Sequence, residues 1–231
     1  MKVAINKNAL ESVINNANPY LEKRDLSAIT SHIFIAAKDG ILSIKATDHE
    51  IGLAYKLSNV KIIDEGNATA NGKKLLDIIR SLKDEEVTLE TLNNYLYIKQ
   101  KNSKYKLPMY KFEDFPNFPT VENKNKFEVD AVMLGRSLKK IFPSIDSNNP
   151  KFELNGALLD IKHNFINIVG TDTKRLSVFR LETPTQSEFS LIIPKKAIGE
   201  IQKLFFDKIE IYYDDTTLIA QSSNFEFFTK L

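Results

Sequence analysis

The sequence repeats itself, and this repeat limits the possible folds more than any other feature of the chain. Thr47-Asp48 recurs as Thr171-Asp172, 124 positions later. A slightly shorter offset of 122 aligns Lys73-Lys74 with Lys195-Lys196. A period this long lies outside the range of short solenoid repeats, so it predicts a duplicated domain. Other pairs at the longer offset are Leu10 with Leu134, Ile14 with Leu138, Pro19 with Pro143, Lys38 with Lys162 and Ile44 with Ile168.

Length and composition agree with two ordinary globular domains. The 231 residues allow two cores, each from about 115 residues. Because the chain has no cysteine, it can build neither a disulfide nor a thiolate metal site. No apolar run approaches the roughly 20 residues that span a bilayer. Residues 1–5 lead into a strand pattern without a signal-peptide core, so we expect a cytoplasmic protein.

Two amphipathic helices are predicted in each half. Residues 7–18 and 131–142 each place apolar side chains along one helical face. Both patterns stop at a proline, Pro19 and Pro143, because the residue before a proline is disfavoured in the helical region. The other two helices are predicted over residues 73–83 and 195–205.

Strand patterns fill the rest of each half. Lys38-Asp39-Gly40 lies between two alternating segments and is typical of a β-hairpin, as is His163-Asn164 at the corresponding place. This order predicts an α+β fold, with two helices on one face of an antiparallel sheet in each half. The predicted strands are 3–5, 33–35, 41–44, 87–92 and 95–99, then 127–129, 157–161, 165–169, 209–213, 217–220 and 225–231.

The segment from Tyr110 to Lys126 is the predicted junction between the halves. It contains Asp114-Phe115-Pro116-Asn117-Phe118-Pro119 and then a polar run. Two prolines followed by polar residues are typical of an interdomain linker. We therefore expect one domain over residues 1–122 and a second over residues 123–231.

Charge is distributed unevenly along the chain, although the formal net charge is only +2. The predicted helices, counted together with Asp84 directly after the second one, carry eleven bases against four acids, so they total +7 and the remainder totals −5. A basic face of this kind indicates binding to a nucleic-acid backbone, whereas a single helix lysine usually only solvates the surface. The eleven bases are Lys7, Lys73, Lys74, Arg80, Lys83, Arg136, Lys139, Lys140, Lys195, Lys196 and Lys203.

The sequence offers no set of residues for catalysis, a metal or a cofactor. The three histidines, His32, His49 and His163, are scattered, and the neighbours of His49 would point to opposite faces of a strand. The chain has no phosphate-binding glycine loop and no nucleophile motif. The repeated Thr-Asp pairs predict turns in which both side chains bond to their own backbone. Only the second pair continues as Thr173-Lys174-Arg175-Leu176, which marks that copy as specialised.

The chain resembles a known family, the sliding clamps that form the beta subunit of bacterial DNA polymerase III. The likeness covers essentially the whole chain, and its motifs follow the family's order. They are Asp114-Phe115-Pro116-Asn117, Leu154-Asn155-Gly156, Thr171-Asp172 with Arg175-Leu176, Pro194-Lys195-Lys196, and Phe228-Thr229-Lys230-Leu231.

The resemblance implies tandem clamp domains and a non-enzymatic function in DNA replication. Clamps of this family have three copies of one α+β domain, and two protomers close head to tail into a ring. The ring encircles duplex DNA and tethers the polymerase, which confers processivity through topology and phosphate contacts without base recognition. Since this chain ends where the second domain finishes, we expect it to lack the third domain and, with it, one of the two surfaces that close the ring.

The resemblance also implies partners and the residues that bind them. The polymerase III catalytic subunit, the clamp loader, other polymerases and repair proteins would dock short linear motifs into a pocket, where the family usually has Gly and His in place of Thr173 and Lys174. This chain's share of the pocket is Leu154, Thr171, Thr173, Lys174, Arg175 and Leu176. For ring closure the matching residues are Lys74, Tyr105 and Leu107. For DNA, the helix bases Lys73, Arg80, Lys83, Arg136, Lys139, Lys140, Lys195 and Lys196 join Arg24, Asn148 and Phe152.

Two other functions remain open from the residues alone. A duplicated, saddle-shaped DNA-binding protein of transcription would need apolar wedges and a basic sheet, whereas the bases here lie on helices. A DNA-modifying enzyme would need a carboxylate cluster or metal site that converges only in the folded chain.

Overall fold

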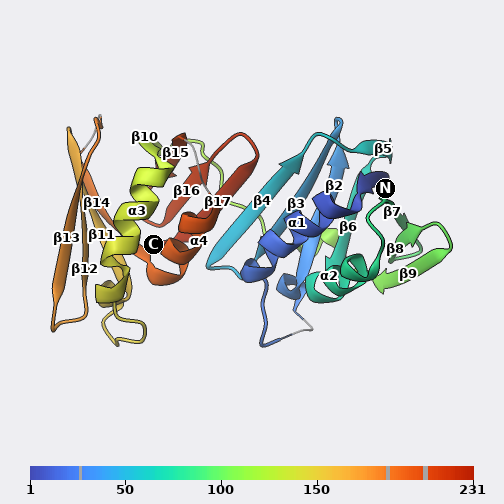
Figure 1. Ribbon diagram of the computed structural model, residues 1–231, viewed down its shortest axis with the longest axis horizontal. Coiled ribbons are helices and arrows are strands. Elements are labelled where there is room, and N and C mark those ends of the chain that lie inside the picture. Colours follow the sequence, from blue (N-terminus) through green and yellow to red (C-terminus); the bar gives the residue numbers. More distant parts are fainter. Residues whose placement is uncertain (26–27, 186–187, 205–207) are drawn as a thin grey trace. The chain divides into compact units, whose positions relative to one another are not determined.

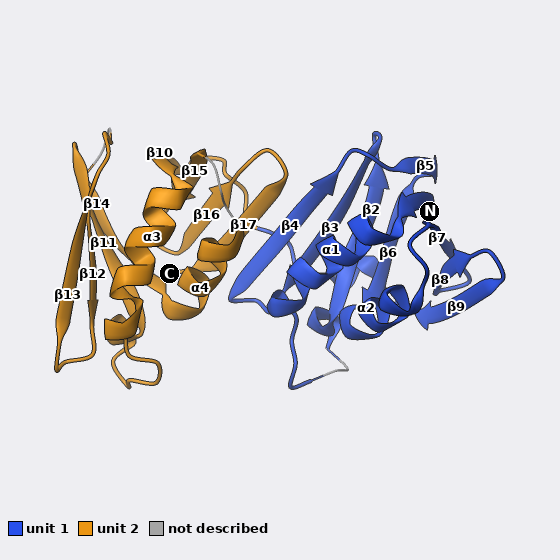
Figure 2. Ribbon diagram, in the orientation of Figure 1, with its two compact units in different colours: residues 1–118 blue, residues 119–231 orange. Residues whose placement is uncertain are grey.

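The computed structural model describes residues 1–25, 28–185, 188–204 and 208–231. The chain divides into two compact units, Met1–Phe118 and Pro119–Leu231 (Figure 2). Each unit contains two helices and several antiparallel strands, which confirms the predicted α+β fold class.

Unit 1 is built from two sheets and two helices (Figure 1). One sheet has the strand order β5-β1-β7-β8-β9, and in the other β4, β3, β2 and β6 lie side by side. The elements are β1 (Lys2–Asn6), α1 (Lys7–Ala17), β2 (His32–Lys38), β3 (Ile41–Thr47), β4 (Ile51–Leu57), β5 (Lys61–Asp64), β6 (Gly66–Asn71), α2 (Gly72–Ser81), β7 (Glu86–Leu92), β8 (Tyr95–Gln100) and β9 (Ser103–Pro108).

Unit 2 repeats this plan. Its strands β10, β15, β16 and β17 lie side by side in one sheet, and the second has the order β13-β12-β11-β14. The elements are β10 (Asn125–Asp130), α3 (Ala131–Ile141), β11 (Gly156–Lys162), β12 (Phe165–Thr171), β13 (Leu176–Glu182), β14 (Phe189–Pro194), α4 (Lys195–Leu204), β15 (Lys208–Tyr213), β16 (Thr217–Gln221) and β17 (Phe225–Lys230). Residue 205, the last of the predicted fourth helix, lies outside the described residues.

The sequence predicted one sheet per half, and this prediction is wrong because each unit has two. The helices pack where the two sheets meet, since α1 contacts β1 and β3 and α2 contacts β6 and β9. In unit 2, α3 likewise contacts β10, β12 and β13, while α4 contacts β11, β14 and β17. Both helices of a unit therefore bury one face against strands and leave the other face outward.

The helices begin and end where local chemistry sets their limits. Asn6, Asn71 and Asp130 cap three of them, and each side-chain oxygen accepts a backbone N–H of the first turn. The first and third helices end just before Pro19 and Pro143, which lie in short 3-10 turns. These ends fall one residue earlier than the sequence predicts.

Buried aliphatic side chains hold the helices to the sheets. Leu10, Ile14, Leu75 and Ile79 are fully buried in unit 1. Burial of each such side chain contributes roughly 1.5–3 kcal/mol. Their counterparts in unit 2 are Leu134, Leu138, Ala197 and Ile201, which are also buried. The repeated sequence positions are thus the positions that form the two cores.

The predicted hairpin between β2 and β3 is present. Lys38 pairs with Ile41, so Asp39 and Gly40 form a two-residue loop. Both have positive φ angles, 51° and 75°. This is the backbone that a tight hairpin turn requires and that Asp-Gly favours.

Part of the predicted linker packs onto unit 1. The hydroxyl of Thr69 on β6 donates to Tyr110 O at 3.0 Å and accepts from Tyr110 N at 2.8 Å. The ring of Phe115 stacks on Phe34, with centroids 5.4 Å apart. The segment that follows β9 therefore belongs to the packing of this unit.

His32 begins β2 as a buried polar residue. Its side chain is 5% exposed and stacks on Tyr110 at 4.3 Å, and its Nδ1 has no hydrogen-bond partner among the described residues. Burial first, and the nearby Lys74 ammonium second, lower the pKa of His32 to about 4 from 6.5. The fold therefore holds the neutral imidazole.

We expect His32 to make stability depend on pH between 6.5 and about 4. In this window the unfolded chain binds a proton that the folded chain does not, so the free energy of unfolding falls by about 3 kcal/mol as the pH is lowered. Urea unfolding across this range checks it. The variant His32→Phe keeps the stacked ring and should lose this part of the pH dependence. The exposed His163→Gln serves as the control, and equal curves for both variants would contradict the assignment.

Candidate functional site

The outward faces of the four helices are basic. Within their observed bounds they carry ten bases and three acids, a net charge of +7. Lys83, the last residue of the predicted second helix, lies beyond its observed end at Ser81, as does Asp84. Lys83 is instead fixed through its backbone, because its N–H donates to Gln100 Oε1 at 3.0 Å and its carbonyl accepts from Gln100 Nε2 at 2.9 Å.

Arg80, Lys195 and Lys140 are candidate DNA-binding bases that interact with groups of their own unit. Arg80 donates to Asn15 Oδ1 at 2.8 Å and lies 3.6 Å from the Glu11 carboxylate. Lys195 donates to Ile145 O and Ser147 Oγ, both at 2.7 Å. The ammonium of Lys140 lies over the Phe179 ring, 4.3 Å from its centroid. Lys73, Arg136, Lys139 and Lys196 are exposed on the helices.

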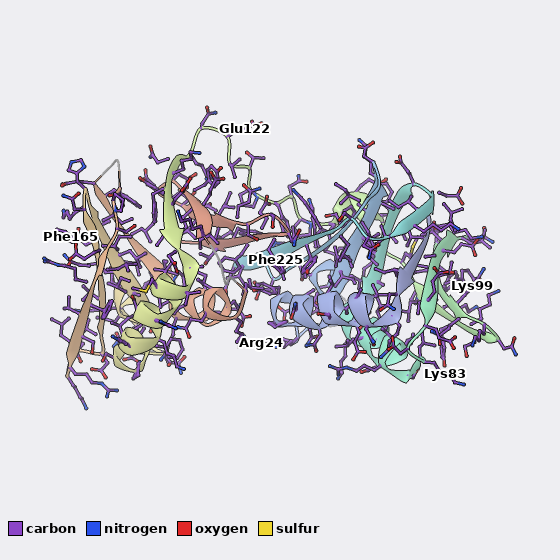
Figure 3. The ribbon with its side chains drawn as sticks, turned by 45° about the horizontal axis from the view of Figure 1, so that its top comes forward. Arg24, Lys83, Lys99, Glu122, Phe165 and Phe225 are labelled. Carbon is purple, nitrogen blue, oxygen red and sulfur yellow. The ribbon has the colours of Figure 1, made fainter. Side chains whose placement is uncertain are left out.

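The candidates outside the helices lie on exposed loops. Arg24 follows α1 and its 3-10 turn, and Figure 3 shows its side chain at the surface of unit 1. Its backbone N–H donates to Glu22 Oε1 at 2.6 Å, and this bond lowers the pKa of Glu22. Asn148 and Phe152 occupy the loop between α3 and β11, where the Phe152 side chain is 56% exposed.

The two Thr-Asp pairs form the same turn twice, as the sequence predicts. In unit 1, Thr47 Oγ1 donates to Ile51 O, and Asp48 Oδ1 accepts two backbone N–H groups. In unit 2, Thr171 Oγ1 donates to Arg175 O, and Asp172 Oδ1 accepts the N–H groups of Lys174 and Arg175. His49 occupies the first turn and is exposed.

Arg175 makes the second turn different from the first, where Ile51 stands. Its Nε donates to Asp172 Oδ2 at 2.9 Å and its Nη2 donates to Pro143 O at 2.7 Å. Partial burial opposes ionisation of Asp172, yet the amides of Lys174 and Arg175 and this guanidinium hold its pKa below the usual value. The sequence did not predict that the carbonyl of Pro143 accepts this hydrogen bond, because every residue has a backbone carbonyl and residue type cannot distinguish this one.

The predicted pocket residues come from two segments that the structure links. Thr171, Thr173, Lys174, Arg175 and Leu176 form the turn between β12 and β13. Leu154 lies in a 3-10 turn, and its carbonyl accepts from the backbone N–H of Asp146 at 3.1 Å. Asp146 is three residues beyond Pro143, whose carbonyl accepts from Arg175, so this stretch of chain connects the two segments.

Two of these pocket residues have unusual surroundings. Thr173 has a φ of 72°, a conformation that favours glycine. Leu176 is 65% exposed, which leaves an apolar side chain in contact with solvent.

The predicted ring-interface residues are placed unequally. Lys74 is exposed on the first turn of α2, and Tyr105 is 39% exposed on β9, an edge strand of its sheet. Leu107 is only 6% exposed, so its side chain belongs to the core of unit 1. Of these two residues of β9, only Tyr105 has a side chain that faces outward.

The described residues contain no group of three or more His, Asp or Glu that could hold a metal ion. Within the same part of the chain, no helix is long and apolar enough to cross a membrane.

Comparison with known protein families matches both units in chain order. Residues 1–119 match the N-terminal domain of the DNA polymerase III beta subunit, and residues 128–231 match its central domain. The chain belongs to the DNA polymerase III beta subunit family. Its two units are therefore sliding-clamp domains, and each of these domains carries two of the exposed basic helices.

Individual relatives and solved structures agree with this family assignment. The beta sliding clamp of Helicobacter pylori strain J99 is 40% identical over 237 residues, which cover 100% of this clamp chain and 63% of that protein. A crystal structure of the Helicobacter pylori beta clamp bound to a DNA ligase peptide is 41% identical, with a TM-score of 0.93 over 100% of this chain and 66% of that one. The beta subunit of Pseudomonas aeruginosa shares the fold, with a TM-score of 0.94 at 24% identity over 100% of this chain and 64% of that one. The chain thus spans less than two thirds of the Helicobacter pylori J99 clamp's length.

We expect Asp172→Ala to loosen the second turn. The backbone N–H groups of Lys174 and Arg175 lose their shared acceptor, so hydrogen exchange at these two amides should accelerate. Exchange measured by NMR gives the rates. Asp48→Ala is the matched control, because it should accelerate exchange at Glu50 and Ile51 and leave the second turn unchanged. Unchanged exchange at Lys174 in Asp172→Ala would show that other contacts fix the turn.

Proposed function

We propose that this chain supplies two domains of a DNA sliding clamp. The clamp encircles duplex DNA, tethers the replicative polymerase and so confers processivity, without a catalytic site of its own. The observation that carries the proposal is the match of both units, in order, to the clamp domains. In the proposed ring, domain 1 spans residues 1–122, domain 2 spans residues 123–231, and a third domain completes the protomer of a cytoplasmic homodimer.

The charge distribution supports contact with a DNA backbone. A net charge of +7 on the helices, against a total of +2, concentrates positive potential on the helical faces. Phosphate contacts of this kind hold DNA without reading its bases, so they permit sliding. Lys73, Arg136, Lys139 and Lys196 are exposed and suit this role, as do Arg24, Asn148 and Phe152 on the loops.

The turn between β12 and β13 supports peptide docking. The Helicobacter pylori clamp binds a DNA ligase peptide, and we propose that this chain docks short linear motifs of the polymerase III catalytic subunit, the loader and repair proteins. Leu176 offers an exposed apolar side chain, and Arg175 fixes the turn beside it. Lys74 and Tyr105 are proposed to contribute to the ring interface.

The proposal predicts that the clamp is held on DNA by topology. A protein in which a third clamp domain follows Leu231, loaded by a clamp loader onto nicked circular DNA, should stay bound through gel filtration at moderate salt. Linearising the DNA should release it, because a ring slides off a free end. Equal retention on both forms, falling only as salt rises, would instead indicate ordinary backbone binding and contradict the proposal.

A second prediction concerns Leu176. Leu176→Asp should weaken binding of the ligase peptide to the three-domain protein by about tenfold or more, because burial of a leucine contributes roughly 1.5–3 kcal/mol. Fluorescence anisotropy of a labelled peptide measures the affinity. Leu92→Asp, which alters a similarly exposed leucine in unit 1, is the control. An equal affinity for both variants would remove Leu176 from the pocket.

A further inference from the structure

Lys195 begins α4, and its side chain is directed toward the segment that follows α3. The ammonium donates to Ile145 O and to Ser147 Oγ, both at 2.7 Å. It also lies over the Phe142 ring, 5.0 Å from the centroid. Residues 142–147 are called the bridging segment from here on, and Lys195 contacts this segment at three places.

The bridging segment is also bonded to residues of the proposed peptide pocket. Arg175 Nη2 donates to Pro143 O at 2.7 Å. The backbone N–H of Asp146 donates to Leu154 O at 3.1 Å. Because Lys195 bonds to neighbouring residues of the same short stretch, the bridging segment connects the start of α4 with the pocket.

Strand β12 approaches the bridging segment closely just before the turn between β12 and β13. Ile145 is 3% exposed, and a methyl group added at Gly170 would lie 2.9 Å from its Cγ1 atom. Gly170 directly precedes Thr171, the first pocket residue of the turn. The hydroxyls of Ser144 and Ser177 add a contact with β13, since their oxygen atoms lie 2.6 Å apart. A shift of the bridging segment would therefore displace the turn as well.

Asp146 fixes the conformation at the end of the bridging segment. Its carboxylate accepts the N–H groups of Ser147 and Asn148, at 2.6 and 3.3 Å, and the side-chain amide of Asn149 at 3.0 Å. These bonds, that of the Asn149 side chain first, lower the pKa of Asp146, and the Lys195 ammonium adds a smaller effect in the same direction. The carboxylate thus stays ionised at neutral pH and keeps its acceptor bonds.

Unit 1 has the same backbone arrangement at the equivalent place. The N–H of Glu22 donates to Thr30 O at 3.0 Å. At the repeat offset of 124, these two residues correspond to Asp146 and Leu154. The side chains around the two segments can therefore be compared position by position.

The side-chain contacts that are polar in unit 2 are apolar in unit 1. Tyr20, Ile51 and Leu53 of unit 1 occupy the positions of Ser144, Arg175 and Ser177. All three of these unit 1 residues are at most 2% exposed. Unit 1 thus holds its segment by core packing, whereas unit 2 holds the bridging segment by hydrogen bonds.

The start of the second helix differs between the units in the same way. Helix α2 begins with Gly72, and a methyl group there would lie 2.2 Å from Leu21 Cδ1. Leu21 corresponds to Ile145 at the offset of 124. In unit 1 an apolar side chain therefore fills the space beside the helix start, where α4 has the side chain of Lys195.

We infer that Lys195 is a positioning residue of the peptide pocket, because it fixes the bridging segment that holds Arg175 and Leu154. The inference rests on the proposed docking of linear motifs and adds to it a residue outside the pocket. Two of the three donors of the ammonium are used within unit 2, which suits this role better than a phosphate contact. A site already held in its binding conformation binds more tightly than one that must be ordered on binding.

The first test is the affinity of the DNA ligase peptide for the three-domain protein, measured by fluorescence anisotropy. Lys195→Gln should weaken binding by about fivefold or more, because the charge-assisted bonds to the bridging segment are lost and the pocket spends less time in its binding conformation. Lys203→Gln is the matched control. It removes the same charge from the last turn of α4 and should leave the affinity unchanged.

Two further measurements separate positioning from a general loss of stability. Lys195→Arg keeps a charged donor and should retain most of the peptide affinity. In the present chain, Lys195→Gln should also accelerate hydrogen exchange at the Asp146 amide, measured by NMR. The Glu22 amide makes the equivalent bond in unit 1 and should exchange at an unchanged rate.

The possible results separate this inference from the proposed function. Weaker peptide binding in Lys195→Gln, its recovery in Lys195→Arg and faster exchange at Asp146 would support the positioning role. Equal affinity for Lys195→Gln and the unaltered protein would overturn the inference and leave the clamp proposal intact, and so would an equal loss in both Lys195 variants. If the unaltered three-domain protein does not bind the peptide, the docking proposal itself fails.

Duplex DNA binding across a salt series tests the competing assignment. A lysine that contacts a phosphate contributes about one to the slope of log Kobs against log salt. If Lys195→Gln lowered this slope by about one and left peptide binding unchanged, Lys195 would be a phosphate contact and the positioning role would be overturned.

Discussion

The structure depends on the burial of one apolar face of each helix at the place where two sheets meet. Leu10, Ile14, Leu75 and Ile79 are fully buried in unit 1, and the aliphatic residues at the same repeat positions are buried in unit 2. Burial of one face fixes the rotation of a helix about its axis, so it also decides which residues face outward. The basic surface therefore follows from the core, because the lysines and arginines occupy the helix positions that are not buried against the sheets.

Much of this arrangement could be predicted from the sequence, for physical reasons that differ between elements. The helices follow from strict apolar spacing, and their ends from Pro19 and Pro143. The Thr-Asp turns were predicted because both side chains bond locally, so no distant residue decides their structure. In contrast, β6 has the sequence Gly66–Asn71, whose small and polar residues indicate a turn, yet Ala68, Thr69 and Ala70 are buried. Such a strand is fixed by pairing with β2, which no local pattern reveals.

The same limit applies to the candidate site, whose binding roles stay predictions. Residue type identifies exposed cations such as Lys73 and Arg136, but it cannot tell which cations are already engaged. Lys195 was predicted as a DNA contact, and its ammonium donates to Ile145 O and Ser147 Oγ. Leu107 matched an interface position of the family, and its side chain is buried.

Duplication explains why the two units differ where they do. A buried position is constrained by its neighbours on every side, so Leu10 and Leu134 both remain leucine after the halves diverge. An exposed helix position is free to change, and there Glu11 and Asp77 correspond to Gly135 and Gly199.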